Sequence, residues 1–455
     1  MKRAALSALL IAVLLAASAA YAEPPCIALE GPSYASASID VDEDGAPEYI
    51  LELNHWNLKS AKGVSRITYC PANQTLHYTQ DLYSMEPRRS TVYGYPEIYY
   101  GYKPWNSLQA SDGEVRLPLP LPQAKPLWVA VNYTISHQPR LPINLALDLW
   151  LTREKNPRKV GGGDAEVMVW LYHSSLRPAG APVARLKCPA YLDGKPYTAS
   201  FTLWEARFNW LYLAYVLDTP LPRGAVAVDM ACILSHAAAR HPWIEKLYLE
   251  DVELGTEYGL PGVQRASFHW SLYRFTVTRH NPEEPLAVTL EAVDTRGNPL
   301  PGVEFTVNER PAGETGGDGK LVLHLKPGDY VVSAPSRHTW NGTVYVFKGW
   351  SSGGSNHYTL LIAGLDGSLT AIYTLEGAAN KRGGEKPAPP VTGGTPKKGG
   401  ESKPSAAKQK RGVESVNASR SGEAEGGPGG GPEVLLLAAA VAAAAVAVYV
   451  WRRRR

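Results

Sequence analysis

Hydrophobic and polar residues alternate along residues 163–172. Successive side chains of a β-strand point to opposite faces of a sheet, so this period of two predicts a strand with two unlike faces. The apolar face is formed by Ala165, Val167, Val169 and Leu171. The opposite face carries acids and large flat side chains, namely Asp164, Glu166, Met168, Trp170 and Tyr172. We therefore predict a strand that packs on a core with one face and carries polar chemistry on the other.

The preceding residues 145–152 repeat this pattern, with leucines on one face and Asp148 and Trp150 on the other. Residues 153–163 are polar and contain Gly and Pro, which indicates a hairpin connection. An antiparallel pair would bring Asp148 close to Glu166, and two nearby acids push each other's pKa values apart.

Carboxylates among aromatic rings are typical of a sugar-binding surface. Rings stack on the CH faces of sugars, and cleavage of a glycosidic bond requires two carboxyl groups. A half-buried strand whose Glu166 pairs with an arginine explains this stretch alone equally well. Earlier in the chain, Glu52, Asn54 and Trp56 share one face of another predicted strand. An acid, an amide and an indole in a row suit the floor of a sugar-binding cleft.

Three further stretches complete the pattern of the first 280 residues. Residues 94–105 are dense in aromatics, and they predict either a cleft wall that includes Glu97 and Trp105 or a buried tyrosine ladder. Residues 201–217 again alternate aromatic and polar side chains and include Asn209. Residues 229–247 carry apolar side chains at helical spacing, which predicts a single helix packed against the strands.

Five segments together resemble the signature segments of glycoside hydrolase family 12, the retaining endo-β-1,4-glucanases. They are LELNHWNLKS (51–60), GYPEIYYGYKPW (94–105), LPINLALDLWLTR (141–153), GDAEVMVWLY (163–172) and ELGTEYG (253–259). They occur in the family's order over residues 26–278. The resemblance implies an all-β, concanavalin-like jelly roll of two antiparallel sheets with one packed helix over residues 23–279.

The resemblance also implies roles for individual residues. Glu166 would be the nucleophile, Glu257 the general acid/base and Asp148 a supporting carboxylate that hydrogen-bonds Glu166, and no cofactor would be needed. The substrate-binding residues would be Asn54, Trp56, Glu97, Trp105, Met168, Trp170 and Asn209. The expected substrate is a β-glucan such as cellulose. Xyloglucan, a mixed-linkage β-glucan, and a non-catalytic glucan-binding role are the alternatives.

The two ends of the chain predict export and anchoring. Residues 1–22 have the charged start, apolar run and small-x-small site of a signal peptide. Residues 433–451 form an apolar run long enough to span a membrane, and the Arg tail 452–455 would lie in the cytoplasm. The catalytic domain would then lie outside the cell. Residues 377–432 are rich in Gly, Pro, Lys and Ser and predict a disordered linker.

Residues 286–376 have a strand-and-turn pattern that is similar to a small immunoglobulin-like β-sandwich. Trp340 and Trp350 could make this module glucan-binding, and a plain spacer is the alternative. The net charge of +3 gives no reason to expect nucleic-acid binding, and we expect a monomer.

The cysteines and acids of the chain suggest two structural features. Cys26, Cys70, Cys188 and Cys232 permit three pairings, and the resemblance implies a Cys26–Cys70 bond, which leaves Cys188 and Cys232 as the second pair. Asp40, Asp42 and Asp44 precede a glycine in a pattern that resembles the start of a calcium loop. A tight hairpin with a solvated acidic rim is the other interpretation, and no His or CxxC cluster indicates another metal.

Overall fold

The computed structural model of the protein describes residues 25–110 and 113–376. The predicted signal peptide (1–22), linker (377–432), transmembrane helix (433–451) and Arg tail (452–455) lie outside the described residues. Within the ranges that are described, none of the helices has the length and apolarity to cross a membrane.

The first eighteen strands are joined edge to edge by hydrogen bonds. They are β1 (Ile27–Glu30), β2 (Ser36–Ile39), β3 (Tyr49–Glu52), β4 (Leu58–Cys70), β5 (Thr75–Pro87), β6 (Glu97–Tyr102), β7 (Gln109–Ala110), β8 (Leu119–Pro120), β9 (Trp128–His137), β10 (Ile143–Thr152), β11 (Ala165–Ser174), β12 (Ala181–Leu192), β13 (Lys195–Arg207), β14 (Leu211–Leu217), β15 (Arg223–Asp229), β16 (Tyr248–Leu249), β17 (Asp251–Gly255) and β18 (Arg265–Thr278). This part of the chain is an all-β sandwich with few helices, as the resemblance implies.

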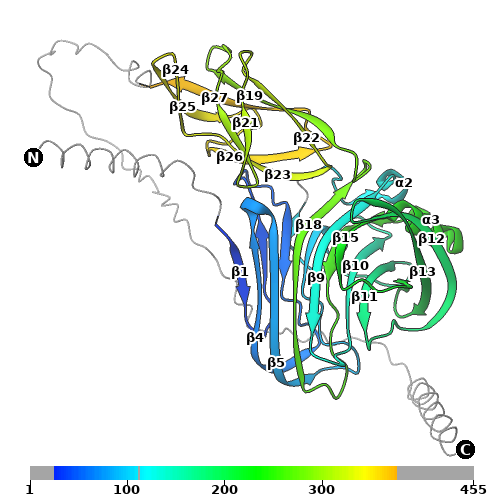
Figure 1. Cartoon of the computed structure of the whole chain (residues 1–455). Helices are drawn as coiled ribbons and strands as arrows, with labels where there is room; N and C mark the ends of the chain where they lie inside the picture. Colours follow the sequence, from blue (N-terminus) through cyan, green and yellow to red (C-terminus); the bar gives the residue numbers. More distant parts are fainter. Residues whose placement is uncertain (1–24, 111–112, 377–455) are drawn as a thin grey trace, which may run out of the picture. The chain divides into compact units, whose positions relative to one another are not determined.

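Two groups of strands define its layers. In one group β4, β5, β18 and β9 lie side by side (Figure 1). In the other, β3, β6, β17, β10, β11 and β14 follow one another. The pairs are antiparallel except for β11 with β14, which run parallel because the β12–β13 hairpin intervenes between them. The expectation of purely antiparallel sheets is wrong at this one pair.

The core lies between these layers and follows the predicted parity. Leu147 and Leu149 of β10 and Val167 and Val169 of β11 are completely buried in one large hydrophobic cluster. Their neighbours in sequence point to the opposite face, which carries the candidate chemistry.

The helical part is shorter than predicted. The helix α3 (Met230–Arg240) buries Met230, Ile233 and Leu234 in the main cluster, and Asp229 caps it by accepting a hydrogen bond from the Cys232 N–H. It ends at Arg240 and not at residue 247, because Pro242 cannot continue a helix and a 3-10 turn, η2 (Pro242–Lys246), follows. Two other short turns are η1 (Pro71–Asn73) and α2 (Leu121–Ala124).

Residues 286–375 form two further sheets around a core of their own. The five-stranded sheet has the order β22-β19-β27-β25-β24, and the four-stranded sheet has the order β21-β20-β23-β26. The strands are β19 (Leu286–Asp294), β20 (Glu304–Val307), β21 (Arg310–Glu314), β22 (Lys320–Leu325), β23 (Gly328–Ser333), β24 (Arg337–Trp340), β25 (Thr343–Trp350), β26 (Tyr358–Ala363) and β27 (Ser368–Leu375). Trp350 is buried in that core, whereas Trp340 is 39 % exposed. The immunoglobulin-like assignment of this region stays a prediction.

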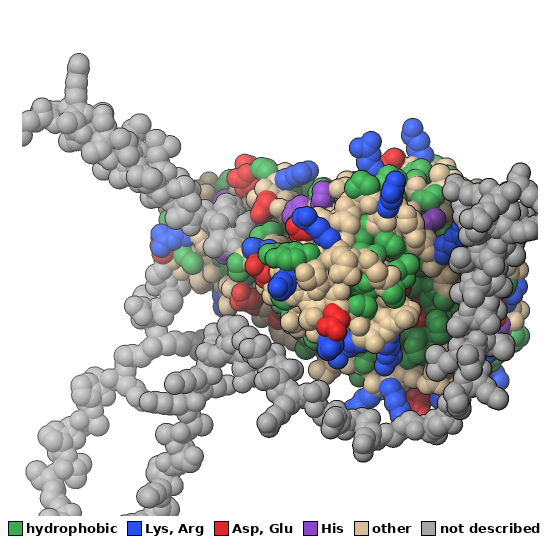
Figure 2. Space-filling model, turned by 90° about the horizontal axis from the view of Figure 1, so that it is seen from below, with side chains coloured by type: hydrophobic (Ala, Val, Ile, Leu, Met, Phe, Trp, Pro, Cys, Tyr) green, Lys and Arg blue, Asp and Glu red, His purple; other side chains and the backbone are tan. Residues whose placement is uncertain are grey.

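On the face shown in Figure 2, Lys and Arg side chains stand among apolar and uncharged ones, and they form no single basic patch among the described residues visible there.

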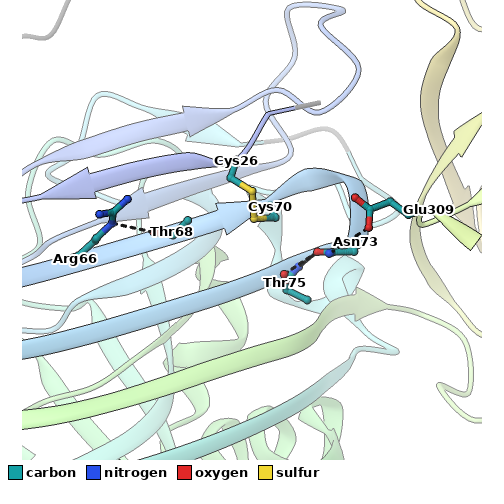
Figure 3. Close-up of a disulfide and its surroundings, with 7 residues drawn as sticks. All are labelled: Cys26, Arg66, Thr68, Cys70, Asn73, Thr75 and Glu309. Carbon is teal, nitrogen blue, oxygen red and sulfur yellow. Dashed lines mark hydrogen bonds between the residues drawn. A yellow bond between two sulfur atoms is a disulfide. The ribbon is translucent and has the colours of Figure 1, made fainter. Parts of the chain in front are cut away.

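Two disulfides tie distant segments together. Cys26 is bonded to Cys70, which joins the start of β1 to the end of β4 (Figure 3). Cys188 of β12 is bonded to Cys232 of α3. These are the two pairs that the resemblance implies.

Removing the second disulfide tests how strongly it stabilises the fold. A Cys188→Ala, Cys232→Ala double variant should lose about 2–4 kcal/mol of unfolding free energy, since the bond closes a loop with a sequence separation of 44. Chemical denaturation of wild type and variant measures this difference. An unchanged denaturation midpoint would contradict the expectation.

Candidate active site

Glu166 lies in β11 between Trp150 of β10 and Tyr212 of β14. The alternation that buries Val167 turns Glu166 to the opposite face, where it is 9 % exposed. Trp210 donates its indole N–H to Glu166 Oε2 at 2.6 Å. Because an indole N–H can only donate, this contact favours the ionised carboxylate.

Glu257 is held in place by Asn144 of β10. The Asn144 side chain donates to Glu257 Oε2 at 2.6 Å and accepts from the Glu257 backbone N–H at 2.8 Å. The Asn144 backbone N–H also donates to the Glu257 carbonyl at 3.0 Å. The glycines on either side of Glu257 allow this conformation of the backbone. A Cβ on Gly255 would come within 2.8 Å of Glu97 and Tyr95, and Gly259 has a φ of +74°.

The two carboxyl groups are electrostatically linked. Burial raises the pKa of Glu166 to about 8; the Trp210 hydrogen bond opposes this rise, and the charge of Glu257 adds to it. Burial raises the pKa of Glu257 to about 7, and the Asn144 hydrogen bond opposes it. Carboxyls that interact in this way titrate as a pair. The site can therefore hold one ionised and one protonated carboxyl near neutral pH, which is the combination that a nucleophile and an acid require.

Asp148 lies near Glu166 but does not make the predicted hydrogen bond. The register places Asp148 opposite Met168 and Glu253, and it places Trp150 opposite Glu166. No hydrogen bond between Asp148 and Glu166 occurs among the described residues, and Trp210 provides the donor in its place. Burial raises the pKa of Asp148 well above its usual value, and the charge of Glu166 raises it further. Both effects favour the protonated form of Asp148 next to Glu166.

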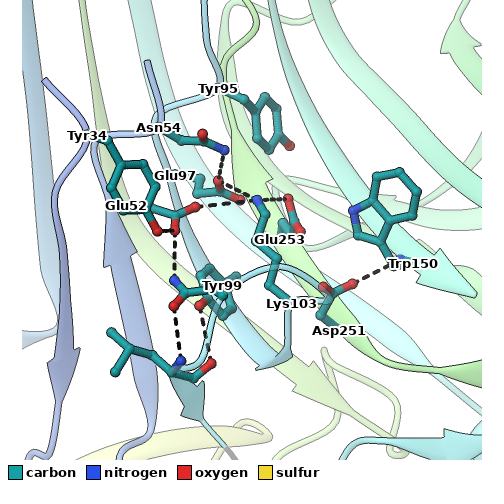
Figure 4. Close-up of polar contacts among 12 residues, drawn as sticks. Tyr34, Glu52, Asn54, Tyr95, Glu97, Tyr99, Lys103, Trp150, Asp251 and Glu253 are labelled. Carbon is teal, nitrogen blue, oxygen red and sulfur yellow. Dashed lines mark hydrogen bonds and ion pairs between the residues drawn. The ribbon is translucent and has the colours of Figure 1, made fainter. Parts of the chain in front are cut away.

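A single lysine lies among three buried carboxyl groups beside this pair (Figure 4). Lys103 Nζ is 2.6 Å from Glu97 Oε1, 3.0 Å from Glu253 Oε2 and 3.5 Å from Glu52 Oε2. Asn106 donates to Glu52 at 2.7 Å, and Tyr34 also donates to Glu52. We call Glu52, Glu97, Lys103 and Glu253 the lysine cluster.

The lysine cluster corrects one expectation about substrate contacts. Glu97 is fully buried and binds Lys103, so it has no surface to offer a sugar. Asn54 is 7 % exposed, and its amide donates to Glu97 at 2.9 Å. A substrate contact of Asn54 stays a prediction.

Exposed aromatic rings surround the carboxyl pair. Trp56 is 44 % exposed and Trp105 is 50 % exposed. Trp105 packs edge-on against Trp150 with ring centroids 4.7 Å apart, and Trp150 packs against Trp210 at 5.5 Å. Phe208 continues this row at 5.5 Å from Trp210 and is 53 % exposed. The row therefore links an exposed ring to the residue that binds Glu166.

Three other predicted contact residues differ in placement. Met168 and Trp170 are each 1 % exposed, because side chains on this face pack together in a second apolar cluster with Tyr212. The Trp170 indole N–H donates to Met168 Sδ at 3.4 Å. These two residues cannot stack on a ligand directly. Asn209 is exposed and lines a surface hollow of about 420 Å³ with Arg153 and Asp164.

Sequence reasoning missed Lys103, Asn144, Trp210 and Tyr212. Lys103 and Glu97 are an even number of residues apart, so an extended strand would point both to the same face, and this was the available signal. Glu253, another carboxyl that Lys103 binds, lies 150 residues from Lys103 in the sequence. Burial raises the pKa of Tyr212, and the nearby acids Glu257, Glu166 and Asp148 raise it further. Nothing in the local sequence identifies such partners.

The chain is similar to one protein family and to several solved structures. The family model described as glycosyl hydrolase family 12 matches residues 47–278. The endoglucanase cel12A from Rhodothermus marinus is 24 % identical, with 55 % of this chain and 98 % of that chain covered and a TM-score of 0.43. The family 12 xyloglucanase from Bacillus licheniformis is 19 % identical, with 55 % and 99 % covered and a TM-score of 0.43. No curated protein matches the chain.

Replacing the buried lysine tests the electrostatic account of the site. A Lys103→Met variant leaves the buried Glu52, Glu97 and Glu253 without their cation, so the unfolding free energy should fall by about 3–5 kcal/mol. Chemical denaturation measures this loss. The matched control is Lys59→Met, which breaks an exposed ion pair with Glu86 and should leave the denaturation midpoint unchanged. Equal stability of the two variants would contradict the account.

Proposed function

Because the chain belongs to glycosyl hydrolase family 12, we propose that it is a retaining endo-β-1,4-glucanase. The observation that carries the proposal is the carboxyl pair itself. Glu166 is bonded to a pure donor, Glu257 is clamped by Asn144, and the charge of Glu257 raises the pKa of Glu166. A retaining glycosidase needs such a pair, with one carboxylate ionised and the other protonated.

In the proposed first step, the Glu166 carboxylate attacks the anomeric carbon of a glucosyl unit. The bond from that carbon to the leaving oxygen breaks, and Glu257 transfers its proton to this oxygen. A covalent glycosyl–enzyme ester on Glu166 results. Trp210 stabilises the ionised Glu166 before attack, and the raised pKa of Asp148 disfavours a second negative charge beside it.

In the second step, Glu257 is ionised and takes a proton from a water molecule. The resulting hydroxide attacks the anomeric carbon, and the ester bond to Glu166 breaks. Both carboxyl groups return to their first state, and the configuration at the anomeric carbon is retained after two inversions. Exposed Trp56, Trp105 and Phe208 would hold the glucan chain by stacking on its sugar faces.

We also propose that the enzyme acts outside the cell and is anchored in the membrane. Residues 1–22 support export, and two disulfides within the described residues fit an oxidising compartment. Residues 433–451 support a C-terminal membrane anchor. The β-sheets of residues 286–375 and the segment 377–432 would then separate the enzyme from the membrane.

A substrate panel tests the activity. The full-length chain should release reducing ends from carboxymethylcellulose and barley β-glucan, with xyloglucan and xylan as the competing substrates. Glu166→Gln should show no turnover, and Glu257→Gln should lose about 10²–10⁴-fold, while both variants still bind glucan. Preference for xyloglucan would reassign the substrate. Glucan binding without hydrolysis by the wild-type chain would overturn the proposal in favour of a non-catalytic binding protein.

The pH profile tests the role of Trp210. Its N–H lowers the pKa of Glu166, so a Trp210→Phe variant should raise that pKa. Since Glu166 must be ionised to attack, kcat/KM on the acid side of the profile should fall about tenfold, which corresponds to one pKa unit for the loss of one hydrogen bond to a charged group, and kcat/KM on the alkaline side should not change.

Trp243→Phe, in the turn η2 after helix α3, is the control and should leave the profile unchanged. On the alkaline side both proteins should lose activity, because the carboxyl pair then loses its last proton and Glu257 can no longer act as an acid. Equal kcat/KM of Trp210→Phe and wild type on the acid side would remove Trp210 from the mechanism.

A further inference from the structure

The loop between β2 and β3 gathers three carboxylates. One carboxylate oxygen from each of Asp40, Asp42 and Glu48 lies within 4.8 Å of the others. Oxygens that bind one Ca²⁺ ion at about 2.3–2.6 Å are at most about 5 Å apart, so these three can share an ion. The set differs from the one suggested by the sequence, because Glu48 takes the place of Asp44.

Two oxygens of this group are buried without a hydrogen-bond donor. Glu48 is completely buried; its Oε2 accepts from the Val41 N–H at 2.6 Å, and its Oε1 has no partner. Asp42 Oδ2 accepts from Thr359 and from the Leu360 N–H, whereas Oδ1 is buried and has no partner. A buried carboxylate oxygen without a partner is costly, so each of these two atoms requires a cation or a proton.

No basic side chain fills this need. None of the ion pairs within residues 25–110 and 113–376 involves Asp40, Asp42 or Glu48. Burial raises the pKa of Glu48 to about 9. The hydrogen bond from the Val41 N–H opposes this rise, and the charge of Asp42 adds to it. In the lysine cluster Lys103 supplies the cation for the buried carboxyls, whereas residues 40–48 contain no basic residue.

We propose that Asp40, Asp42 and Glu48 bind a Ca²⁺ ion. Carboxylate oxygens are the ligands that this hard cation prefers, and its charge would satisfy the two orphaned oxygens together. Asp44 is not a ligand, because it is exposed and its Oδ1 accepts from the Ala46 N–H at 2.7 Å. Asp40 is oriented by the loop, whose Asp44 and Gly45 N–H groups donate to its two oxygens.

The ion would stabilise the loop that leads into the active site. Strand β3 begins directly after Glu48 and ends at Glu52, which belongs to the lysine cluster. Asp42 meanwhile accepts hydrogen bonds from β26. The bound ion therefore fixes one end of the strand that supplies a carboxyl to the floor of the site, and its role is structural.

The test is the thermal unfolding of the full-length chain after treatment with EGTA and dialysis. Adding CaCl₂ should raise the midpoint by at least about 3 °C, whereas MgCl₂ at equal ionic strength should not. Glu48→Gln should abolish the calcium response and should unfold at about the same temperature as wild type without calcium, because the amide oxygen can still accept from the Val41 N–H and the amide, like the protonated carboxyl, carries no charge. That second result separates loss of the site from failure to fold.

Asp44→Asn is the matched control in the same loop and should keep the full calcium response. A wild-type midpoint that does not respond to calcium would overturn the proposal. So would a Glu48→Gln variant that responds as wild type does, or an Asp44→Asn variant that loses the response. An equal response to MgCl₂ would also overturn it, because the effect would then not be specific to calcium.

Discussion

The active site depends on the ion pairs that the ammonium group of Lys103 makes with three buried carboxylates. This ammonium group is the cation for Glu52, Glu97 and Glu253, which come from strands β3, β6 and β17. Buried carboxylates repel one another strongly where water is excluded, so these strands could not lie side by side without it. Strand β17 leads directly to Glu257, and β6 pairs with both β3 and β17. The position of the proposed acid therefore depends on a contact that does not touch the substrate.

The hydrogen-bond donors around them distinguish the two proposed catalytic carboxyls from the other acids of the site. Glu166 receives a hydrogen bond from Trp210, and Glu257 receives one from Asn144. Asp148 has no hydrogen bond to Glu166, and burial and the charge of Glu166 raise its pKa. Similar side chains thus acquire different protonation states from their neighbours, which is how one site can supply both a nucleophile and an acid.

Strand parity explains how much of this could be predicted. Alternation placed Val167 in the core and Glu166 on the opposite face correctly, whereas the fold class was predicted from the resemblance to the family. Parity says nothing of what covers a face, so Met168 and Trp170 were expected to be open and are buried under a second apolar cluster. The register, which sets Trp150 and not Asp148 opposite Glu166, depends on pairing between strands and is invisible in a single strand.

The residues that sequence reasoning missed have distant partners. Trp210 is 44 residues from Glu166, and Asn144 is 113 residues from Glu257. Glu48 replaced Asp44 in the acidic loop because the chain turns back after Gly45, which has a φ of +95°. Such contacts arise from the tertiary fold, whereas local spacing predicts only the side chains that share a strand face.

The central claim is that Glu166 forms a covalent bond to the sugar, and trapping that bond tests it most directly. The full-length chain is incubated with a 2-deoxy-2-fluoro-β-cellobioside carrying a good leaving group, then digested and analysed by peptide mass spectrometry. The account predicts a fluoroglycosyl adduct on the peptide that contains Glu166, and none in Glu166→Gln. An adduct on another carboxylate, or turnover of glucan with inversion at the anomeric carbon and no adduct at all, would contradict it.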